Sequence, residues 1–254
     1  MGITVDEHKV VRFDPTSEQL VSTSIAANPS SNRFNGLLIY GVFKRLYNKE
    51  GDRRDSDGNP LIYALKSTSG FSISMKECAK FSSNLSIILN KILSKKSYEI
   101  IIVMPSSKPI AKRFSIKIQR KLGLDILILA DVFTKKTIEE VYNDLIVLQV
   151  RKEDRKDLIA LRRDLEPRVA KEPKTIFSMK EIAKKYRKFI KPLKYNPEFI
   201  VELPHLKGKS IVLVDDLLAS GSTLGSAYEL LLDREITENI EAICLLGSKE
   251  NCMV

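Results

Sequence analysis

The sequence predicts an α/β fold built on a doubly wound, mostly parallel β-sheet. Two observations lead to this prediction. The 254 residues are 43% hydrophobic, which is enough to bury a substantial core. In the second half of the chain, short β-branched runs alternate with segments of helical periodicity, the pattern of parallel strands joined by helices.

Composition and charge narrow the class of protein. The 11 glycines and 10 prolines are too few for a linker or a collagen-like chain, and no apolar run approaches the roughly 20 residues that span a bilayer. Cys78, Cys244 and Cys252 have no paired spacing, so we expect a cytoplasmic protein without structural zinc. The lack of a long apolar run predicts that the protein has no membrane partner. The net charge of +10 favours polyanionic ligands: phosphorylated small molecules, nucleic acid or an anionic surface.

The first part of the chain gives mixed signals. Residues 1 to 35 are polar and predict an ordered but irregular lead-in. Apolar stretches over residues 36–47 and 60–67, with a turn former at Asp57-Gly58 between them, predict a hairpin or strand pair. Ser74 and Glu77 have the spacing of a capping box ahead of a helix over about residues 75–94.

Strands and helices alternate after residue 98. The apolar runs predict five strands, over residues 98–104, 125–130, 199–203, 211–214 and 240–245. Helical spacing predicts helices over residues 110–122, after the capping pair Thr137 and Glu140, along the leucines that follow the charged run 151–157, and after the pair Ser178 and Glu181.

The site-bearing motif is the segment 211–224, IVLVDDLLASGSTL. A strand delivers two carboxylates, Asp215 and Asp216, and a loop of small residues then leads into a helix. The N–H groups of the loop, its hydroxyls and the positive end of the helix suit a phosphate, while the carboxylates suit ribose hydroxyls or metal-bound water. The motif therefore predicts a site for a phosphorylated sugar. A solvated acidic turn before a capped helix is the alternative interpretation.

This segment resembles the phosphoribosyl-pyrophosphate (PRPP) motif of type I phosphoribosyltransferases, nearly in its adenine-enzyme version. The resemblance implies that Asp215 and Asp216 are the catalytic acids, which hold the ribose hydroxyls and, through water, Mg²⁺. It implies a five-stranded core over residues 96–254 beneath an N-terminal hood of residues 1–95. It also implies that the 5′-phosphate is bound by Ala219, Ser220, Gly221, Ser222 and Thr223.

A loop upstream of the motif adds to the resemblance. In this family the first core strand ends in a loop that binds pyrophosphate, and Ser106, Ser107 and Lys108 match that loop. The ComF-like branch carries an Arg-Gly-Phe-Asn stretch shortly afterwards. Arg113 and the phenylalanine after it match this stretch in part, because the glycine is missing and a serine stands where Asn is usual. Without the downstream motif, these cations would be expected to lie solvated at a helix end.

Two parts of the chain depart from the family pattern. Residues 131–198 form a helix-rich insertion in place of a shorter flexible loop, and its Lys135 and Lys136 could close over the pyrophosphate. Residues 1–95 show only a weak resemblance to the ComF-like branch, in the stretch 63–66 (YALK). Since the hood would contact the acceptor, the sequence does not identify the acceptor.

The resemblance implies an enzyme of nucleotide metabolism that transfers a phosphoribosyl group from PRPP to a nitrogen acceptor and releases pyrophosphate. Such a site must neutralise the leaving pyrophosphate and hold the ribose in line with the attacking nitrogen. Enzymes for 6-oxopurines place an Asp base where this chain has Ala219, so those substrates are disfavoured. A homodimer is common in the family and stays open, as does another protein partner.

Two alternative functions also stay open. One is a non-catalytic regulator that senses PRPP or a nucleotide while a basic surface binds nucleic acid or protein. The other is an effector or toxin of a phage-defence system that uses the same site on a nucleotide or macromolecule. The basic side chains are densest in one segment, namely at Lys180, Lys184, Lys185, Arg187, Lys188, Lys191 and Lys194.

Overall fold

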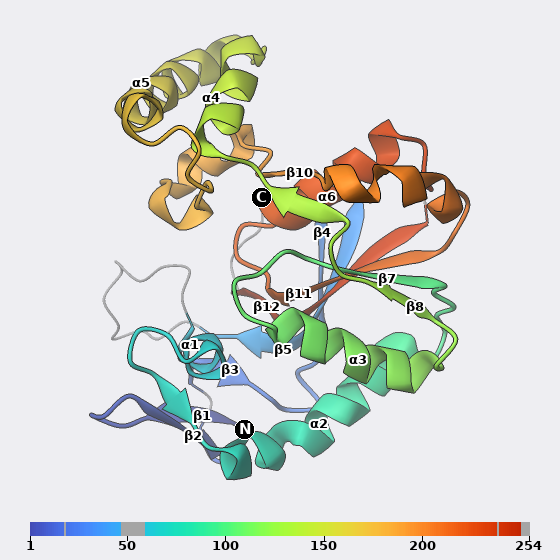
Figure 1. Cartoon of the computed structure of the whole chain (residues 1–254). Coiled ribbons are helices and arrows are strands. Elements are labelled where there is room, and N and C mark those ends of the chain that lie inside the picture. The colour runs from blue at the N-terminus through green and yellow to red at the C-terminus, as the bar shows by residue number, and fades with distance from the viewer. Residues whose placement is uncertain (18, 47–58, 238, 250–254) are drawn as a thin grey trace. The chain divides into compact units, whose positions relative to one another are not determined.

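The structure is a computed structural model that describes residues 1–254 except 18, 47–58, 238 and 250–254 (Figure 1). The chain divides into two compact units. The first unit consists of Met1–Ala130, Gly208–Ala219 and Thr237–Val254, and the second unit of Asp131–Lys207 and Ser220–Ile236. Among the helices formed by the described residues, none is long and apolar enough to span a bilayer.

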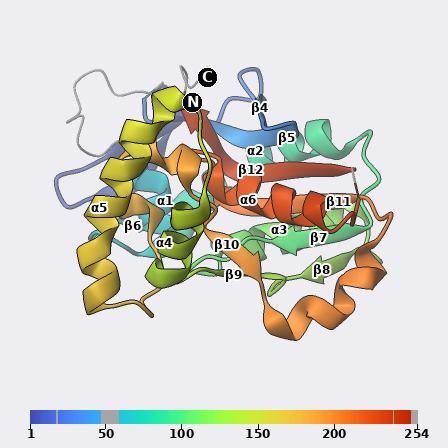
Figure 2. The same cartoon turned by 90° about the horizontal axis from the view of Figure 1, so that it is seen from above.

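A seven-stranded sheet organises the first unit (Figures 1 and 2). Five of its strands run parallel in the order β5-β12-β11-β7-β8, and β3 and β4 pair antiparallel with β5. The seven strands are β3 (Val21–Ser22), β4 (Ser30–Phe34), β5 (Leu37–Arg45), β7 (Ile100–Val103), β8 (Leu127–Leu129), β11 (Ile211–Leu217) and β12 (Ile240–Lys249). The mixed α/β architecture with parallel strands is compatible with the predicted fold class.

The predicted central strands are confirmed as β7, β11 and β12. Their apolar runs are buried, as expected for parallel strands at the centre of a sheet. β8 lies at the sheet edge, so the predicted fully buried strand is wrong there: Leu127 is 53% exposed. The fifth parallel strand is β5, from the first part of the chain, and not the predicted strand at residues 199–203.

The register of β11 fixes where the following residues lie. Residues Ile211 to Val214 pair with β7 on one side and with β12 on the other. The amide of Met104, just after β7, donates to the carbonyl of Val214 at 2.9 Å. Because parallel strands end at the same sheet edge, the segments that follow β7 and β11 meet at that edge.

Three helices belong to the first unit: α1 (Pro60–Lys66), α2 (Met75–Leu93) and α3 (Ile110–Leu122). The predictions of α2 and α3 are confirmed. Only half of the predicted capping box at α2 forms, because the Ser74 hydroxyl accepts from the amide of Glu77 whereas the Glu77 carboxylate accepts from the amide of Phe13. This second bond ties α2 to β2 (Val10–Asp14).

The predicted second strand at residues 60–67 is wrong, because these residues form helix α1. The side-chain oxygen of Asn59 accepts from the amide of Leu61 at 2.9 Å, and Pro60 occupies the first helical position. An N-cap side chain and a first-turn proline are both typical of a helix start. The predicted turn at Asp57-Gly58 lies outside the described residues.

The irregular lead-in predicted for residues 1 to 35 is also wrong. β1 (Gly2–Val5) and β2 pair antiparallel, and β6 (Ser72–Ile73) joins β2 in a small three-stranded sheet. β3 and β4 join the large sheet instead. Ile3 and Val11 are fully buried, so a few apolar residues on each short strand are enough to hold it on the core.

Helices α4 (Ile138–Val147) and α5 (Arg155–Lys171) form the apolar core of the second unit. Both are confirmed predictions. The capping box of Thr137 and Glu140 at the start of α4 is complete, with both reciprocal hydrogen bonds present. On α5, one apolar stripe is buried, formed by Leu158, Leu161 and Leu165.

The rest of the second unit departs from the prediction. The helix expected after Ser178 is two 3₁₀ segments, Met179–Glu181 and Lys184–Phe189, separated by extended backbone, and the Arg187 guanidinium donates to the carbonyl of Ile182. The expected strand at 199–203 lies within the 3₁₀ helix Pro197–Leu206. Proline at both its first position and its interior disfavours a ladder strand there.

Two short strands and one helix complete the second unit. β9 (Phe133–Lys135) and β10 (Leu193–Tyr195) pair antiparallel, and another 3₁₀ segment, Lys152–Asp154, precedes α5. The predicted helix after the motif is confirmed as α6 (Ser222–Asp233), whose Leu224, Ala227 and Leu231 are buried. The hydroxyl of Tyr195 in β10 donates to the carbonyl of Leu230 in α6 at 2.7 Å.

The close approach of β5 and β12 generates a stability prediction. A Cβ atom at Gly41 would lie 2.4 Å from the Cα atom of Gly247, a backbone contact that no side-chain rotation relieves. We expect Gly41→Ala to lower the free energy of unfolding by about 1–3 kcal/mol, as overpacking typically does. Urea unfolding followed by circular dichroism measures this change. Ser31→Ala on exposed β4 is the control and should have little effect; equal stability of both variants would contradict the prediction.

Candidate functional site

The carboxylate pair of the motif lies at the carboxyl end of β11. Successive side chains of a strand point to opposite faces, so Asp215 and Asp216 have different surroundings. Asp215 is half-buried, and its Oδ1 accepts from the amide of Asp216 at 2.7 Å. Asp216 is only 4% exposed, so its charge needs compensation within the protein.

Lys66, the last residue of α1, supplies that compensation. Its Nζ lies 2.6 Å from Oδ2 of Asp216, and its side chain is 17% exposed. The hydroxyl of Ser106 donates to the same oxygen at 3.1 Å. One buried carboxylate is thus held by a cation from the first part of the chain and by a hydroxyl from the loop after β7.

The structure brings together only part of the predicted pyrophosphate loop. Ser106 reaches the acid pair, whereas the side chains of Ser107 and Lys108 are exposed and form no hydrogen bond or ion pair with another described residue. Arg113, in the first turns of α3, is likewise exposed. These three side chains are therefore accessible to an anionic ligand.

Arg45, at the end of β5, is a buried cation that the sequence analysis missed. It is 2% exposed, and its Nε donates to the carbonyl of Gly247 at 2.7 Å. Its guanidinium also donates to the carbonyl of Leu218, directly before Ala219. Arg45 is therefore a positioning residue that fixes the chain as it leaves β11.

The predicted phosphate loop begins the second unit's helix α6. Gly221 is the N-cap with φ of 78°, a left-handed conformation that favours glycine. The hydroxyls of Ser220 and Ser222 lie 3.0 Å apart, the amide of Ser222 donates to the Ser220 hydroxyl at 3.5 Å, and the N-cap Gly221 has no side chain to cap the helix. Thr223 lies in the first turn and is partly exposed. Uncapped amides and hydroxyls at a helix start suit an anion.

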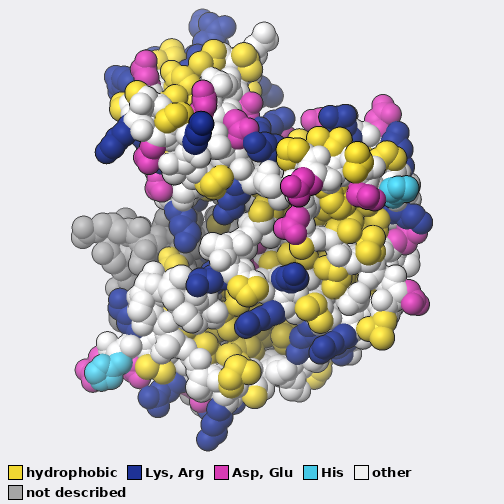
Figure 3. Space-filling model, viewed as in Figure 1, with side chains coloured by type: hydrophobic (Ala, Val, Ile, Leu, Met, Phe, Trp, Pro, Cys, Tyr) yellow, Lys and Arg dark blue, Asp and Glu magenta, His cyan; other side chains and the backbone are white. Residues whose placement is uncertain are grey.

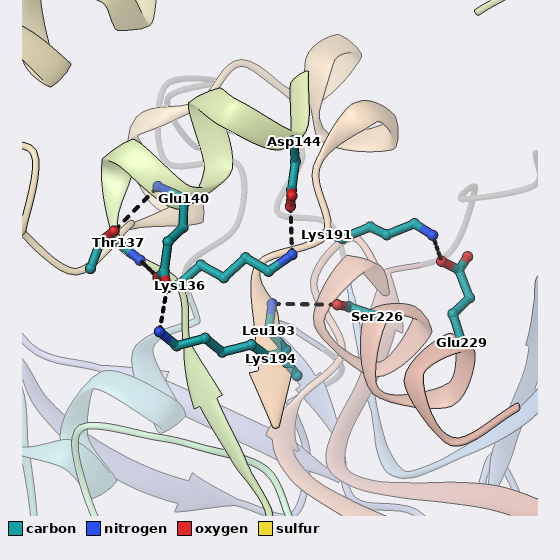
Figure 4. A network of polar contacts seen from close by, with 9 residues as sticks. All are labelled: Lys136, Thr137, Glu140, Asp144, Lys191, Leu193, Lys194, Ser226 and Glu229. Atoms are coloured by element: carbon teal, nitrogen blue, oxygen red, sulfur yellow. Dashed lines mark hydrogen bonds and ion pairs between the residues drawn. The ribbon is translucent and has the colours of Figure 1, made fainter. Parts of the chain in front are cut away.

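The predicted lysines of the insertion are positioned by β9 (Figure 4). Lys135 is the last residue of β9 and is half-buried. Lys136 follows it, and its ammonium group pairs with the carboxylate of Asp144 on α4. Within the second unit, Lys136 is therefore engaged with α4, and an incoming anion would have to compete with Asp144.

The densest basic segment of the sequence is largely ion-paired. Lys185 and Lys188 pair with aspartates of the charged run before and at the start of α5. Lys191 pairs with Glu229 at 2.9 Å, and Lys194 pairs with Glu140 (Figure 4). Four of the seven cations in this segment are thus paired with carboxylates of the same unit.

The thiol of Cys244 lies beside the acid pair in the sheet register, opposite Asp215 on β12. Complete burial, together with the charges of Asp215 and Asp216, raises its pKa well above the ordinary value. A neutral buried thiol is a weak nucleophile. Cys244 is therefore assigned to the core of the sheet.

A comparison with protein families bears on this segment. Residues 169–252 match the family model of the phosphoribosyl transferase domain. The matched stretch contains β11, the acid pair, the following loop, α6 and β12. The match supports the type I phosphoribosyltransferase family. Neither the curated proteins nor the solved structures gave a significant match to the chain.

The buried ion pair predicts a specific energetic coupling. Lys66→Met should lower the free energy of unfolding by about 3 kcal/mol, because it leaves the Asp216 charge buried without a cation. The double variant Lys66→Met, Asp216→Asn should be more stable than the sum of the two single losses predicts. Denaturant unfolding of all four proteins measures the coupling; strictly additive losses would contradict it.

A pH prediction follows from Glu140. Its partial burial raises the pKa, but hydrogen bonds from Lys194 and from the amide of Thr137 outweigh burial and lower it. A lowered folded-state pKa stabilises the protein above the unfolded-state pKa of about 4.3, and this stability is lost as the pH falls through the folded value. Lys194→Gln should raise the pKa of Glu140, and the variant should lose less stability on acidification.

The expected difference is small, about 0.2–1 kcal/mol, because the pair is partly solvated. Titration of the Glu140 carboxyl carbon by NMR, with thermal unfolding across the acid range, measures both effects. Lys174→Gln, at an exposed lysine in the same unit, serves as the control. An unchanged Glu140 titration in Lys194→Gln would disprove the assignment.

Proposed function

We propose that this protein binds PRPP with Mg²⁺ and transfers its phosphoribosyl group to a nitrogen acceptor with release of pyrophosphate. The observation that carries the proposal is the acid pair at the carboxyl end of β11, which the sequence continues directly into the Ser-Gly-Ser-Thr start of α6. The phosphoribosyl transferase match covers this whole segment and supports a function of the phosphoribosyl-transfer type.

The acid pair is assigned to the ribose. Carboxylates accept hydrogen bonds from hydroxyls but repel phosphate, so Asp215 and Asp216 suit the 2′- and 3′-hydroxyls. Asp216 is preorganised by Lys66 and Ser106, while half-buried Asp215 is the more accessible of the two. A fixed carboxylate needs little reorganisation as positive charge develops on the sugar.

The loop residues 219–223 are assigned to the 5′-phosphate. The left-handed backbone at Gly221 turns the chain so that the following amides start the helix. Because the N-cap Gly221 has no side chain and the bond from the Ser222 amide to Ser220 is long, at 3.5 Å, these amides and the positive end of the α6 dipole can face the phosphate. The hydroxyls of Ser220 and Thr223 add donors of adjustable direction, whereas the buried hydroxyl of Ser222 donates to the carbonyl of Arg187 at 3.4 Å and would have to turn toward the phosphate.

The leaving pyrophosphate is assigned to Ser106, Ser107 and Lys108. During the transfer, the bond between the anomeric carbon and the pyrophosphate oxygen breaks, and a bond from the acceptor nitrogen forms. The electron pair of the broken bond leaves on pyrophosphate, whose charge an accessible cation such as Lys108 would stabilise. Arg113, Lys135 and Lys136 are further candidates for this role, and Arg113 would carry the ComF-like feature.

The donor set fits a Mg²⁺ ion held with the substrate. Among the described residues no group of three or more His, Cys, Asp or Glu side chains could hold a metal by itself. Mg²⁺ commonly uses one or two carboxylates together with water and substrate phosphates. Asp215 and Asp216 would hold it through water, and the bound ion would offset the charge of the pyrophosphate.

The acceptor side is assigned to the first part of the chain. Lys66 belongs to the proposed hood of residues 1–95 and already contacts the acid pair. An element of the hood therefore lies beside the proposed ribose position. Ala219 offers no proton acceptor, so a base for the incoming nitrogen would have to come from the acceptor side or from solvent.

A binding experiment tests the proposal. Titration calorimetry should detect binding of PRPP with Mg²⁺, and the double variant Asp215→Ala, Asp216→Ala should bind at least about tenfold more weakly, because it loses both ribose partners. Ser31→Ala, a substitution on exposed β4, is the control variant and should bind PRPP like the unaltered protein. Release of pyrophosphate in the presence of mixed bases or nucleic acid then tests for transfer. Equal binding by the unaltered protein and the folded double variant would overturn the proposal.

A further inference from the structure

The exposed face of helix α3 carries cations that form no ion pair with any acidic side chain in the described part of the chain. The sequence contains no Asp or Glu between Glu99 and Asp125. The cations of the helix are Lys112, Arg113, Lys117, Arg120 and Lys121, and Lys108 precedes it. Among the described residues, none of these six side chains forms an ion pair.

This arrangement is costly for the helix itself. Arg113, Lys117 and Lys121 follow one another at a spacing of four residues, where like charges destabilise a helix. Burial and the neighbouring Lys121 lower the pKa of Lys117, whose ammonium group donates to the Ser82 hydroxyl at 3.0 Å. No acidic residue lies in the first turn to balance the helix dipole. An external anion would offset these costs.

The contrast with the second unit makes α3 distinctive. There, Lys185, Lys188, Lys191 and Lys194 each pair with a carboxylate of the same unit. The lysine-rich segment that dominates the sequence is therefore largely neutralised, and the face of α3 is a region of uncompensated charge in the described structure. Lys and Arg side chains are spread over the face that α3 presents in Figure 3.

We propose that this exposed face of α3 binds the phosphate backbone of a nucleic acid. The 13 residues of α3 extend over about 20 Å. Phosphates follow one another about every 3.4 Å along the axis of each DNA strand, so several cations of the helix can each meet a phosphate. Contacts of this kind are independent of base sequence and depend strongly on salt.

The face suits nucleic acid better than a membrane or a protein. A helix that lies in a membrane interface presents its apolar side to lipid. The apolar side of α3, with Phe114 and Ile118, is buried in the core. A protein interface would need an apolar centre, whereas Ile116, at 36% exposed, is the large apolar side chain between the cations.

Binding of a nucleic acid to α3 does not require PRPP. At one end, however, the face of α3 lies next to the loop of the proposed PRPP site. The loop before α3 contains Ser106, which donates to Asp216. A strand bound along α3 would therefore lead toward the acid pair within the same unit. If the proposed transfer also holds, this placement makes a nucleic acid, or a nucleotide at its end, a candidate acceptor.

Fluorescence anisotropy with a labelled DNA duplex and a labelled single-stranded RNA, without PRPP or Mg²⁺, tests the proposal. The binding affinity should fall by about two orders of magnitude or more between about 50 and 200 mM salt. The triple variant Lys112→Gln, Arg120→Gln, Lys121→Gln should bind at least about tenfold more weakly. Its dependence of log affinity on log salt should be shallower, by about one for each phosphate-binding cation that is removed.

A charge-matched variant distinguishes the effect of the α3 cations on binding from the effect of the protein's net charge. Lys156→Gln, Lys174→Gln, Lys207→Gln removes the same charge from exposed positions of the second unit and should bind like the unaltered protein. Both triple variants should retain PRPP binding, so failure of this inference and failure of the proposed function are distinguishable.

Three results would overturn the inference. These are no oligonucleotide binding by the unaltered protein at low salt, an equal loss of binding in both triple variants, and binding of vesicles rich in anionic lipid without binding of either oligonucleotide. Weaker oligonucleotide binding confined to the α3 variant would support it.

Discussion

A carboxylate buried at the end of a central strand is the constraint on which the site depends. β11 is fixed between β7 and β12, so the register of the sheet places Asp216 where water cannot solvate its charge. An unpaired buried charge is costly, so the fold must bring a cation to it. Lys66 fulfils this requirement from the last position of α1. The acid pair thus links a motif near the carboxyl terminus to an element about 150 residues earlier.

A second buried cation, Arg45, has a related role in the large sheet of the first unit. Arg45 ends β5 and binds carbonyl groups that follow β11 and lie in β12. Carbonyls at strand ends leave the ladder and would otherwise be buried without donors. One guanidinium satisfies them and restrains Leu218, the residue that leads into Ala219. The unit therefore uses one cation to balance a carboxylate and another to hold backbone, and neither is a surface charge.

The sequence predicted the elements whose signals are local and missed those set by distant contacts. The strands around β11 and the helices from α2 to α4 follow from apolar runs, periodicity and capping pairs within about ten residues. By contrast, α1 resembles a strand in composition, and its start depends on the cap at Asn59 and on Pro60. The pairing of Lys66 with Asp216 has no local signal. The acid pair itself was recognisable, because two carboxylates after a buried run are unusual without a ligand or a partner.

The same distinction applies to charge. A count along the sequence finds the basic side chains densest in the segment 180–194, where seven cations fall close together. Folding brings carboxylates from other elements of the second unit to several of them, so their charge is internal to that unit. The cations of α3 are less dense in sequence, yet none of them forms an ion pair with a residue that the structure describes. The surface potential therefore depends on which charges are left unpaired after folding, and the cations of α3 are one such group. The proposed polyanion would meet these unpaired cations, whereas four lysines of the segment 180–194 already face carboxylates of their own unit.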